Sequence, residues 1–144
     1  MTVLRMDHVG MVVEDLRGAI DFFRVLGLEL EGEGTVEGEF VDQVTALDGV
    51  RSEIAMLRTP DGTARIELSK FHKPRSPDGG SNAPANAIGI RHVTFAVDDI
   101  DEAIGALQSQ GAKLVGEVAR YEDDYRLCYM RGPEGIIVEL AQKL

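Results

Sequence analysis

The same order of apolar and polar positions occurs twice along the chain. Residues 8–16 read HVGMVVEDL, and residues 92–100, which lie 84 positions further on (92 − 8 = 84), read HVTFAVDDI. Each segment begins with a short run that is apolar on both faces, a pattern that predicts a buried β-strand. Each run ends in two acidic residues, which are suited to the start of a helix. The repeat indicates that the chain is a duplication of one module.

A helix is predicted after each of these strands. The same offset pairs Gly27 with Gly111, and a glycine at such a position can adopt the left-handed conformation that ends many helices. The two helices are therefore expected over about residues 15–26 and 99–110.

Both modules also end alike. Residues 58–62 (RTPDG) and 131–135 (RGPEG) are rich in the residue types that form turns, and each is followed by a run that closes on Glu-Leu, at Glu67 and at Glu139. The spacing from the turn to the Glu differs by one residue, so this second match requires a gap. Each module is predicted to consist of a strand, a helix and three further strands.

The predicted fold class is α+β, with two tandem βαβββ modules. The first module spans residues 1–71 and carries an insertion at about 36–48, where apolar residues at 40, 41, 44 and 47 have the spacing of a short helix. Residues 72–88 are rich in Pro, Gly and Ser and are expected to form a linker, or a loop that orders only against a partner. The second module spans residues 89–144.

Charge narrows the range of functions. The chain has 15 Lys+Arg against 25 Asp+Glu and a formal net charge of -10, so its surface should repel nucleic acid and anionic membranes. No segment approaches the roughly 18 apolar residues of a membrane span, and the N-terminal residues lack an uninterrupted apolar run. We therefore expect a cytoplasmic protein that acts on a small molecule.

The chain has a single cysteine, Cys128, which excludes an internal disulfide and a cysteine-rich metal site. Cys128 is predicted to be a half-buried strand residue rather than a nucleophile.

Two of the three histidines, His8 and His92, occupy equivalent positions near the start of equivalent strands. Alternation along a strand sets each imidazole on a mostly apolar face. A single histidine in such a place would more often be a hydrogen-bonded core residue. Two histidines at symmetric positions instead favour a shared chemical role.

One carboxylate lies near the end of each module, Glu67 in the first and Glu139 in the second. Glu139 lies in the run GIIVELA, which is apolar on both faces of the predicted strand, so burial of its carboxylate would cost several kcal/mol without a compensating cation or proton. Glu67 alternates with Arg65 and Ser69 on a polar face that solvent could reach. Glu67 is a candidate mainly because it is the counterpart of Glu139 in the repeat.

Each module thus supplies one histidine and one glutamate, which together could hold one divalent cation between the modules. Two imidazoles and two carboxylates suit a borderline first-row ion, namely Ni, Co, Mn, Fe or Zn, and exclude a metal that requires soft thiolate ligands. If the ion takes six ligands, two positions remain open for substrate oxygens or water. Open positions are typical of catalytic rather than structural metal sites.

The paired modules with His8, Glu67, His92 and Glu139 resemble the vicinal oxygen chelate superfamily, which includes glyoxalase I, methylmalonyl-CoA epimerase, extradiol dioxygenases and the fosfomycin and bleomycin resistance proteins. The resemblance runs from His8 to Glu139 and leaves out the linker and the insertion. It implies a glyoxalase-like fold, in which paired βαβββ modules form a cupped, mixed sheet around one metal ion, and commonly a homodimer.

The His, Glu, His, Glu order is most similar to glyoxalase I-like enzymes. The resemblance then implies a metal-dependent lyase or isomerase that acts on a small α-oxygenated carbonyl compound through an enediolate, with Glu139 as the base and Glu67 returning the proton. The chain shows no glutathione-binding pattern, so the need for a thiol stays open. Two alternatives remain: a non-catalytic antibiotic-binding protein of the bleomycin resistance type, and an extradiol dioxygenase, which would need only two His and one carboxylate.

Other polar residues are weaker candidates. Residues 120–126 (RYEDDYR) precede and enter a predicted strand, so Tyr121, Tyr125 or Arg126 could lie over the site, although a solvated loop is the more ordinary interpretation. His72, at the head of the predicted linker, is expected to be a surface residue.

Overall fold

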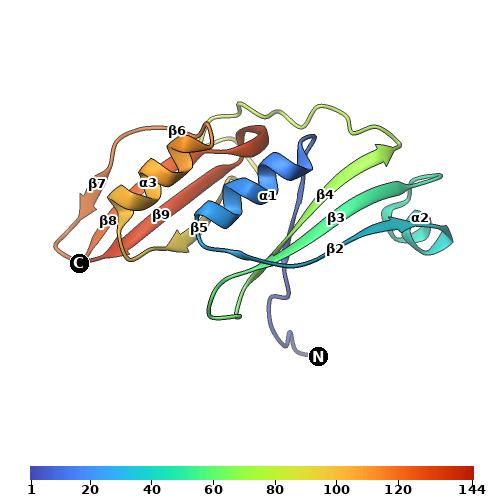
Figure 1. The fold of residues 1–144 in the computed structure, drawn as a ribbon, viewed down its shortest axis with the longest axis horizontal. Coiled ribbons are helices and arrows are strands. Elements are labelled where there is room, and N and C mark those ends of the chain that lie inside the picture. Colours follow the sequence, from blue (N-terminus) through green and yellow to red (C-terminus); the bar gives the residue numbers. More distant parts are fainter. The chain divides into compact units, whose positions relative to one another are not determined.

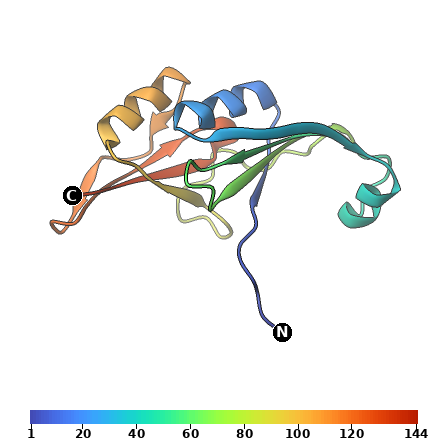
Figure 2. The same cartoon turned by 60° about the horizontal axis from the view of Figure 1, so that its bottom comes forward.

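The computed structural model describes residues 1–144, which form two compact units, Met1–Asp78 and Gly79–Leu144. Each unit contains one mixed β-sheet and one helix that covers it (Figures 1 and 2). The boundary falls within the segment that was predicted to link the two modules. None of the helices has the length and hydropathy that a membrane crossing requires.

The first unit has the predicted order of strand, helix and three strands. Its sheet has the strand order β1-β4-β3-β2, in which β1 and β4 are parallel and the other pairs are antiparallel. A short helix, α2, interrupts the module between β2 and β3, as the apolar spacing predicted. The elements are β1 (Val9–Val12), α1 (Leu16–Val25), β2 (Glu29–Glu37), α2 (Glu39–Thr45), β3 (Arg51–Arg58) and β4 (Arg65–Lys73).

The second unit repeats this topology, with the strand order β5-β9-β8-β6 and parallel pairing of β5 with β9. The strand that follows its helix is divided into two short pieces, β6 and β7, which both pair with β8. The elements are β5 (His92–Ala96), α3 (Ile100–Ser109), β6 (Lys113–Leu114), β7 (Ala119–Tyr121), β8 (Tyr125–Arg131), a 3-10 turn (Pro133–Gly135) and β9 (Ile137–Lys143). The α+β class with duplicated βαβββ modules is confirmed.

Side-chain hydrogen bonds define the start of both main helices. Asp15 Oδ1 accepts from the backbone N–H of Gly18 at 3.0 Å, and Asp99 Oδ1 accepts from that of Glu102 at 3.0 Å. These acidic residues satisfy backbone donors that have no partner within the helix. Both helices lie inside the predicted ranges.

The two faces of each sheet differ in composition. In the first unit, Ala55, Leu57, Ile66 and Leu68 are buried on the face that α1 covers, together with the helix residues Ile20, Phe22 and Phe23. Because side chains alternate along a strand, Glu67, which lies between Ile66 and Leu68, projects from the opposite face. The helix therefore covers the core side of the sheet and leaves the other side available for polar groups.

The second half of the predicted linker is attached to the second unit. The Arg131 guanidinium on β8 donates to the carbonyl oxygens of Ala83 at 3.1 Å and Gly135 at 3.0 Å, and a longer contact of 3.5 Å reaches Ser81 O. Gly135 has φ of +73°, and a Cβ built on it would lie 1.5 Å from Ser81 O. Only glycine fits where the chain crosses itself this closely.

The first half of the predicted linker belongs partly to β4. This strand runs to Lys73, so His72 lies in a strand and not in the linker, and its Nε2 is 3.1 Å from Glu53 Oε1 on β3. Both side chains are exposed, which agrees with the expected surface position of His72.

Replacing Asp15 with Ala should lower the free energy of unfolding by about 1 kcal/mol, because the N–H of Gly18 would lose its acceptor. Urea denaturation followed by circular dichroism measures this change. The matched control is Asp21→Ala, which removes an exposed acid from the same helix and should change stability by less than about 0.5 kcal/mol. Equal losses in both variants would assign the effect to charge and not to capping.

Candidate functional site

The parallel pairing of β1 with β4 brings His8 close to Glu67. Gly10 lies opposite Glu67 in the strand register, and His8, two residues earlier, shares the face of Gly10. His8 Nε2 is 3.7 Å from Glu67 Oε2.

The second unit repeats this arrangement. Thr94 on β5 lies opposite Glu139 on β9, and His92 precedes Thr94 by two residues. His92 Nε2 is 3.9 Å from Glu139 Oε1. In both units the histidine lies two positions before the residue that pairs with the glutamate. The one-residue difference in spacing between the two repeats therefore does not change how each histidine is placed relative to its glutamate.

The two carboxylates are partly shielded and not fully buried. The side chain of Glu139 is 20% exposed and that of Glu67 is 29% exposed. Val138 and Leu140, on either side of Glu139, are buried on the opposite face of the strand under α3. Glu139 thus lies neither in the apolar core nor in bulk water.

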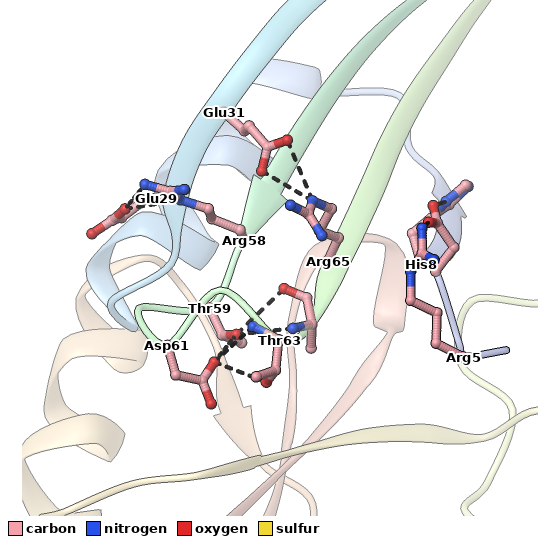
Figure 3. Close-up of polar contacts among 11 residues, drawn as sticks. Arg5, His8, Glu29, Glu31, Arg58, Thr59, Asp61, Thr63 and Arg65 are labelled. Carbon is pink, nitrogen blue, oxygen red and sulfur yellow. Dashed lines mark hydrogen bonds and ion pairs between the residues drawn. The ribbon is translucent and has the colours of Figure 1, made fainter.

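Asp7 orients the imidazole of His8. His8 Nδ1 is 2.8 Å from Asp7 Oδ2, and Arg5 Nη2 donates to Asp7 Oδ1 at 2.9 Å. Figure 3 shows Arg5 and His8 side by side where the chain enters β1. These contacts lower the pKa of the Asp7 carboxyl, mainly through the hydrogen bond from His8 and then through that from Arg5. Because an ionised carboxylate only accepts hydrogen bonds, Nδ1 carries the proton and the lone pair of a neutral ring lies on Nε2, which faces Glu67.

Tyr129 takes the corresponding place in the second unit. Its hydroxyl lies 3.3 Å from His92 Nδ1, and the two rings are 5.0 Å apart between centroids at an angle of 35°. Tyr129 also lies directly opposite Glu139 in the pairing of β8 with β9. Nε2 of His92 is again the nitrogen that faces the glutamate.

Hydroxyl groups contact both carboxylates. Thr94 Oγ1 donates to Glu139 Oε1 at 2.7 Å, whereas Ser69 Oγ lies at 3.5 Å from Glu67 Oε1. The shorter bond holds Glu139 more firmly, since hydrogen bonds weaken steeply near 3.5 Å.

Asp7, Thr94 and Tyr129 were not identified from the sequence. Asp7 is adjacent to His8, and a carboxylate beside a candidate metal-binding histidine is a signal that could have been used. Thr94 and Tyr129 reach the site only through the register of β5, β8 and β9, which a single sequence does not specify across the intervening loops.

Each His–Glu pair has a geometry that suits one shared metal ion. Two ligand atoms that each lie about 2.0–2.2 Å from an ion can be no more than about 4.4 Å apart, and the observed separations are 3.7 Å and 3.9 Å. Neither unit by itself gathers three or more His, Cys, Asp or Glu side chains able to hold a metal ion. The structure brings His8 close to Glu67 and His92 close to Glu139. That all four residues bind one metal ion stays a prediction.

Arg126 does not lie on the face of β8 that carries Tyr129 and faces Glu139. Its guanidinium forms two hydrogen bonds, of 2.9 Å and 3.1 Å, with the carboxylate of Asp101 in the first turn of α3. This contact lowers the pKa of Asp101 and raises that of Arg126. Arg126 thus lies on the helix-covered side of β8, and the less favoured possibility that it could contact substrate has no support in this geometry.

Cys128 is a core residue. It is buried, and burial raises the pKa of its thiol. A neutral buried thiol is a poor nucleophile, as the sequence predicted, although Cys128 is more deeply buried than the half-buried position expected.

Other charged groups in the first unit form ion pairs on the surface of the sheet. Arg58 on β3 donates to Glu29 on the neighbouring strand β2, and Arg65 on β4 donates to Glu31 on β2, across the intervening strand β3 (Figure 3). Because Arg65 is paired with Glu31 at 3.0 Å, it is not the counter-ion of Glu67.

Comparison with known proteins identifies the family. The family model described as the Glyoxalase/Bleomycin resistance protein/Dioxygenase superfamily matches residues 5–140. The chain belongs to this superfamily.

Similar proteins extend over the whole chain. The crystal structure of a glyoxalase family protein from Bacillus cereus is 52% identical, covers 100% of this chain and 97% of its own, and superposes with a TM-score of 0.97. The uncharacterized protein YwbC of Bacillus subtilis is 29% identical over 96% of this chain and 98% of its own length. A more distant structure shares the fold with a TM-score of 0.64 at 13% identity and covers 96% of this chain and 90% of its own. It is a mutant of FosX, a fosfomycin resistance protein from Listeria monocytogenes, complexed with Mn(II) and 1S,2S-dihydroxypropylphosphonic acid.

In the metal-free protein, the pKa of Asp7 should lie below its ordinary value of 3.8 and should rise toward that value in a His8→Ala variant. The contact with His8 therefore persists below the pH at which an ordinary aspartate protonates, and it is lost as the pH falls through the lowered pKa. Carboxyl carbon shifts in an NMR titration measure this. His92→Ala is the matched control and should leave Asp7 unchanged, whereas equal effects of both variants would contradict the assigned cause.

Proposed function

We propose that this protein is a metal-dependent lyase or isomerase of the glyoxalase I-like type that acts on a small α-oxygenated carbonyl compound. The observation that carries the proposal is the repeated His–Glu pair, with Nε2–carboxylate distances of 3.7 Å and 3.9 Å at equivalent positions of both units. A structural role for one such pair would be unremarkable, but chance repetition of the same pair in both modules is a poor explanation.

His8, Glu67, His92 and Glu139 are the proposed ligands of one divalent ion. Nitrogen and carboxylate donors suit Ni, Co, Mn, Fe or Zn, and the FosX relative is described with Mn(II). Asp7 and Tyr129 support the assignment, because each contacts the Nδ1 atom of a proposed ligand and leaves its Nε2 available. The two pairs would meet within one chain or across a homodimer, which is the assembly we expect.

The proposed reaction removes a proton from the carbon beside the substrate carbonyl and returns a proton to the substrate. The bound ion would polarise the substrate carbonyl and so acidify the adjacent C–H. Glu139 would accept that proton, and the hydrogen bond from Thr94 at 2.7 Å holds its carboxylate in place. Glu67, once it has left the ion and taken up a proton from solvent, would return a proton to the substrate on its other face. Glu139 would then release its proton to solvent, so both carboxyl groups would end as they began.

Protein purified without chelator should contain close to one divalent ion per set of four ligands, as measured by elemental analysis. His8→Ala and His92→Ala should each weaken metal binding by about tenfold or more, because each removes one ligand. His72→Ala is the control, since His72 contacts Glu53 at the surface and is not a proposed ligand. A wild-type protein that binds no divalent ion, or a His8→Ala variant that keeps full affinity, would contradict the proposed site.

Glu139→Gln should abolish exchange of the substrate C–H proton with solvent deuterium, with a loss of about 100-fold or more. The substrate is first found by screening hemithioacetals, acyl-CoA epimers and catechols against the metal-loaded protein, and exchange is then followed by proton NMR. Glu102→Gln, on the exposed surface of α3, is the matched control and should retain activity. Oxygen uptake with catechols would instead identify a dioxygenase, and full exchange in Glu139→Gln would remove Glu139 from the mechanism.

A further inference from the structure

A cavity of about 310 Å³ lies against Glu139, entirely within the second unit. Residues 115–117 form one side of it, residues 127–129 of β8 form another, and the Glu139 carboxylate completes the lining. The cavity therefore adjoins the group that we assign as the base.

The broken second strand of this unit creates the cavity. β6 pairs with β8 at Leu114 and Met130, and β7 pairs with β8 at Ala119 and Leu127. The N–H of Val115 still donates to Tyr129 O at 2.9 Å, and residues 116–118 then leave the ladder before β7 begins. In the first unit β2 pairs continuously with β3 from Gly32 to Glu37, so the two modules differ at this place.

The lining is apolar with acidic groups only. Val115, Leu127 and the ring of Tyr129 supply apolar surface, and Glu117 and Glu139 are the charged residues of the lining. Lys, Arg and His are absent from it. The proposed ion would offset the charge of Glu139, so an anionic group entering the cavity would meet the like charge of Glu117, on a protein whose net charge is already -10.

We propose that this cavity receives the tail of the substrate, and that this tail is apolar and either uncharged or cationic, with Glu117 as the residue that disfavours anionic tails. The inference rests on the proposed function, because Glu139 is what joins the cavity to the reacting carbon. The volume lies at the lower end of the roughly 300–1,000 Å³ range of ligand pockets. It suits a group of about one aromatic ring.

The test uses hydroxamic acids, which chelate metal ions through two adjacent oxygens and differ here only in the tail. Acetohydroxamic acid has almost no tail, benzohydroxamic acid has a neutral ring, and 4-carboxy and 4-aminomethyl derivatives add a negative or a positive charge. Isothermal titration calorimetry on the metal-loaded wild-type protein gives the four affinities without any need for turnover.

Benzohydroxamic acid should bind about tenfold or more tightly than acetohydroxamic acid, because the ring loses contact with water. The 4-carboxy derivative should bind about tenfold or more weakly than benzohydroxamic acid, and the 4-aminomethyl derivative at least as tightly as benzohydroxamic acid. Glu117→Gln should reduce the penalty on the carboxylate, whereas Glu102→Gln should not. Val115→Phe, which fills the cavity, should remove the advantage of the ring and leave acetohydroxamic acid affinity nearly unchanged.

The outcomes separate the two proposals. Equal affinity for all four tails, or preference for the carboxylate, would overturn the cavity assignment while leaving the metal site intact. If the 4-carboxy derivative binds Glu117→Gln as weakly, relative to benzohydroxamic acid, as it binds the wild-type protein, the proposed role of Glu117 is wrong. If neither metal nor acetohydroxamic acid binds the wild-type protein, the proposed function itself fails, and the inference falls with it.

Discussion

Parallel pairing of the first and last strands of each module determines which side chains meet. In both units this pairing places a histidine near the start of one strand beside a glutamate in the middle of the other. Parallel neighbours cannot be joined by a tight turn, so the helix and two intervening strands form the long connection between them. The same connection buries the core on one face and leaves the opposite face for the polar pair.

The two pairs are alike in their positions and different in their surroundings. A carboxylate, Asp7, contacts His8, whereas a phenol, Tyr129, contacts His92. A carboxylate acceptor makes an imidazole more electron-rich than a neutral phenol does. Glu139 also has a short hydrogen bond from Thr94 and an adjoining cavity. These differences are the physical basis for assigning unequal roles to Glu67 and Glu139.

The duplicated fold could be predicted because its signals are local. Asp15 and Asp99 precede apolar helical patterns, and Gly27 and Gly111 follow them, so the helix limits were accessible from the sequence. The pairing of each histidine with its glutamate could be predicted only through the symmetry of the repeat.

Features that depend on strand register could not be predicted in the same way. Tyr129 lies opposite Glu139 because β8 and β9 pair in one particular register, and that register is set by contacts between distant segments. The face of β8 on which Arg126 lies could not be predicted for the same reason, since a one-residue shift exchanges the two faces of a strand. The break between β6 and β7, on which the cavity depends, likewise has no clear sequence signal beyond Gly116.

The crossing of Gly135 and Ser81 has a consequence for how this chain tolerates mutation. The atom that blocks a side chain at position 135 belongs to the backbone of residue 81, so no change of rotamer can make room for even a methyl group. Any replacement of this glycine must displace the segment around Ser81, which lies far earlier in the chain. The guanidinium of Arg131 contacts the carbonyl oxygens of Ser81 and Ala83 in that segment. Acceptable substitutions at this turn are thus limited by a distant stretch of polypeptide and not by the turn itself.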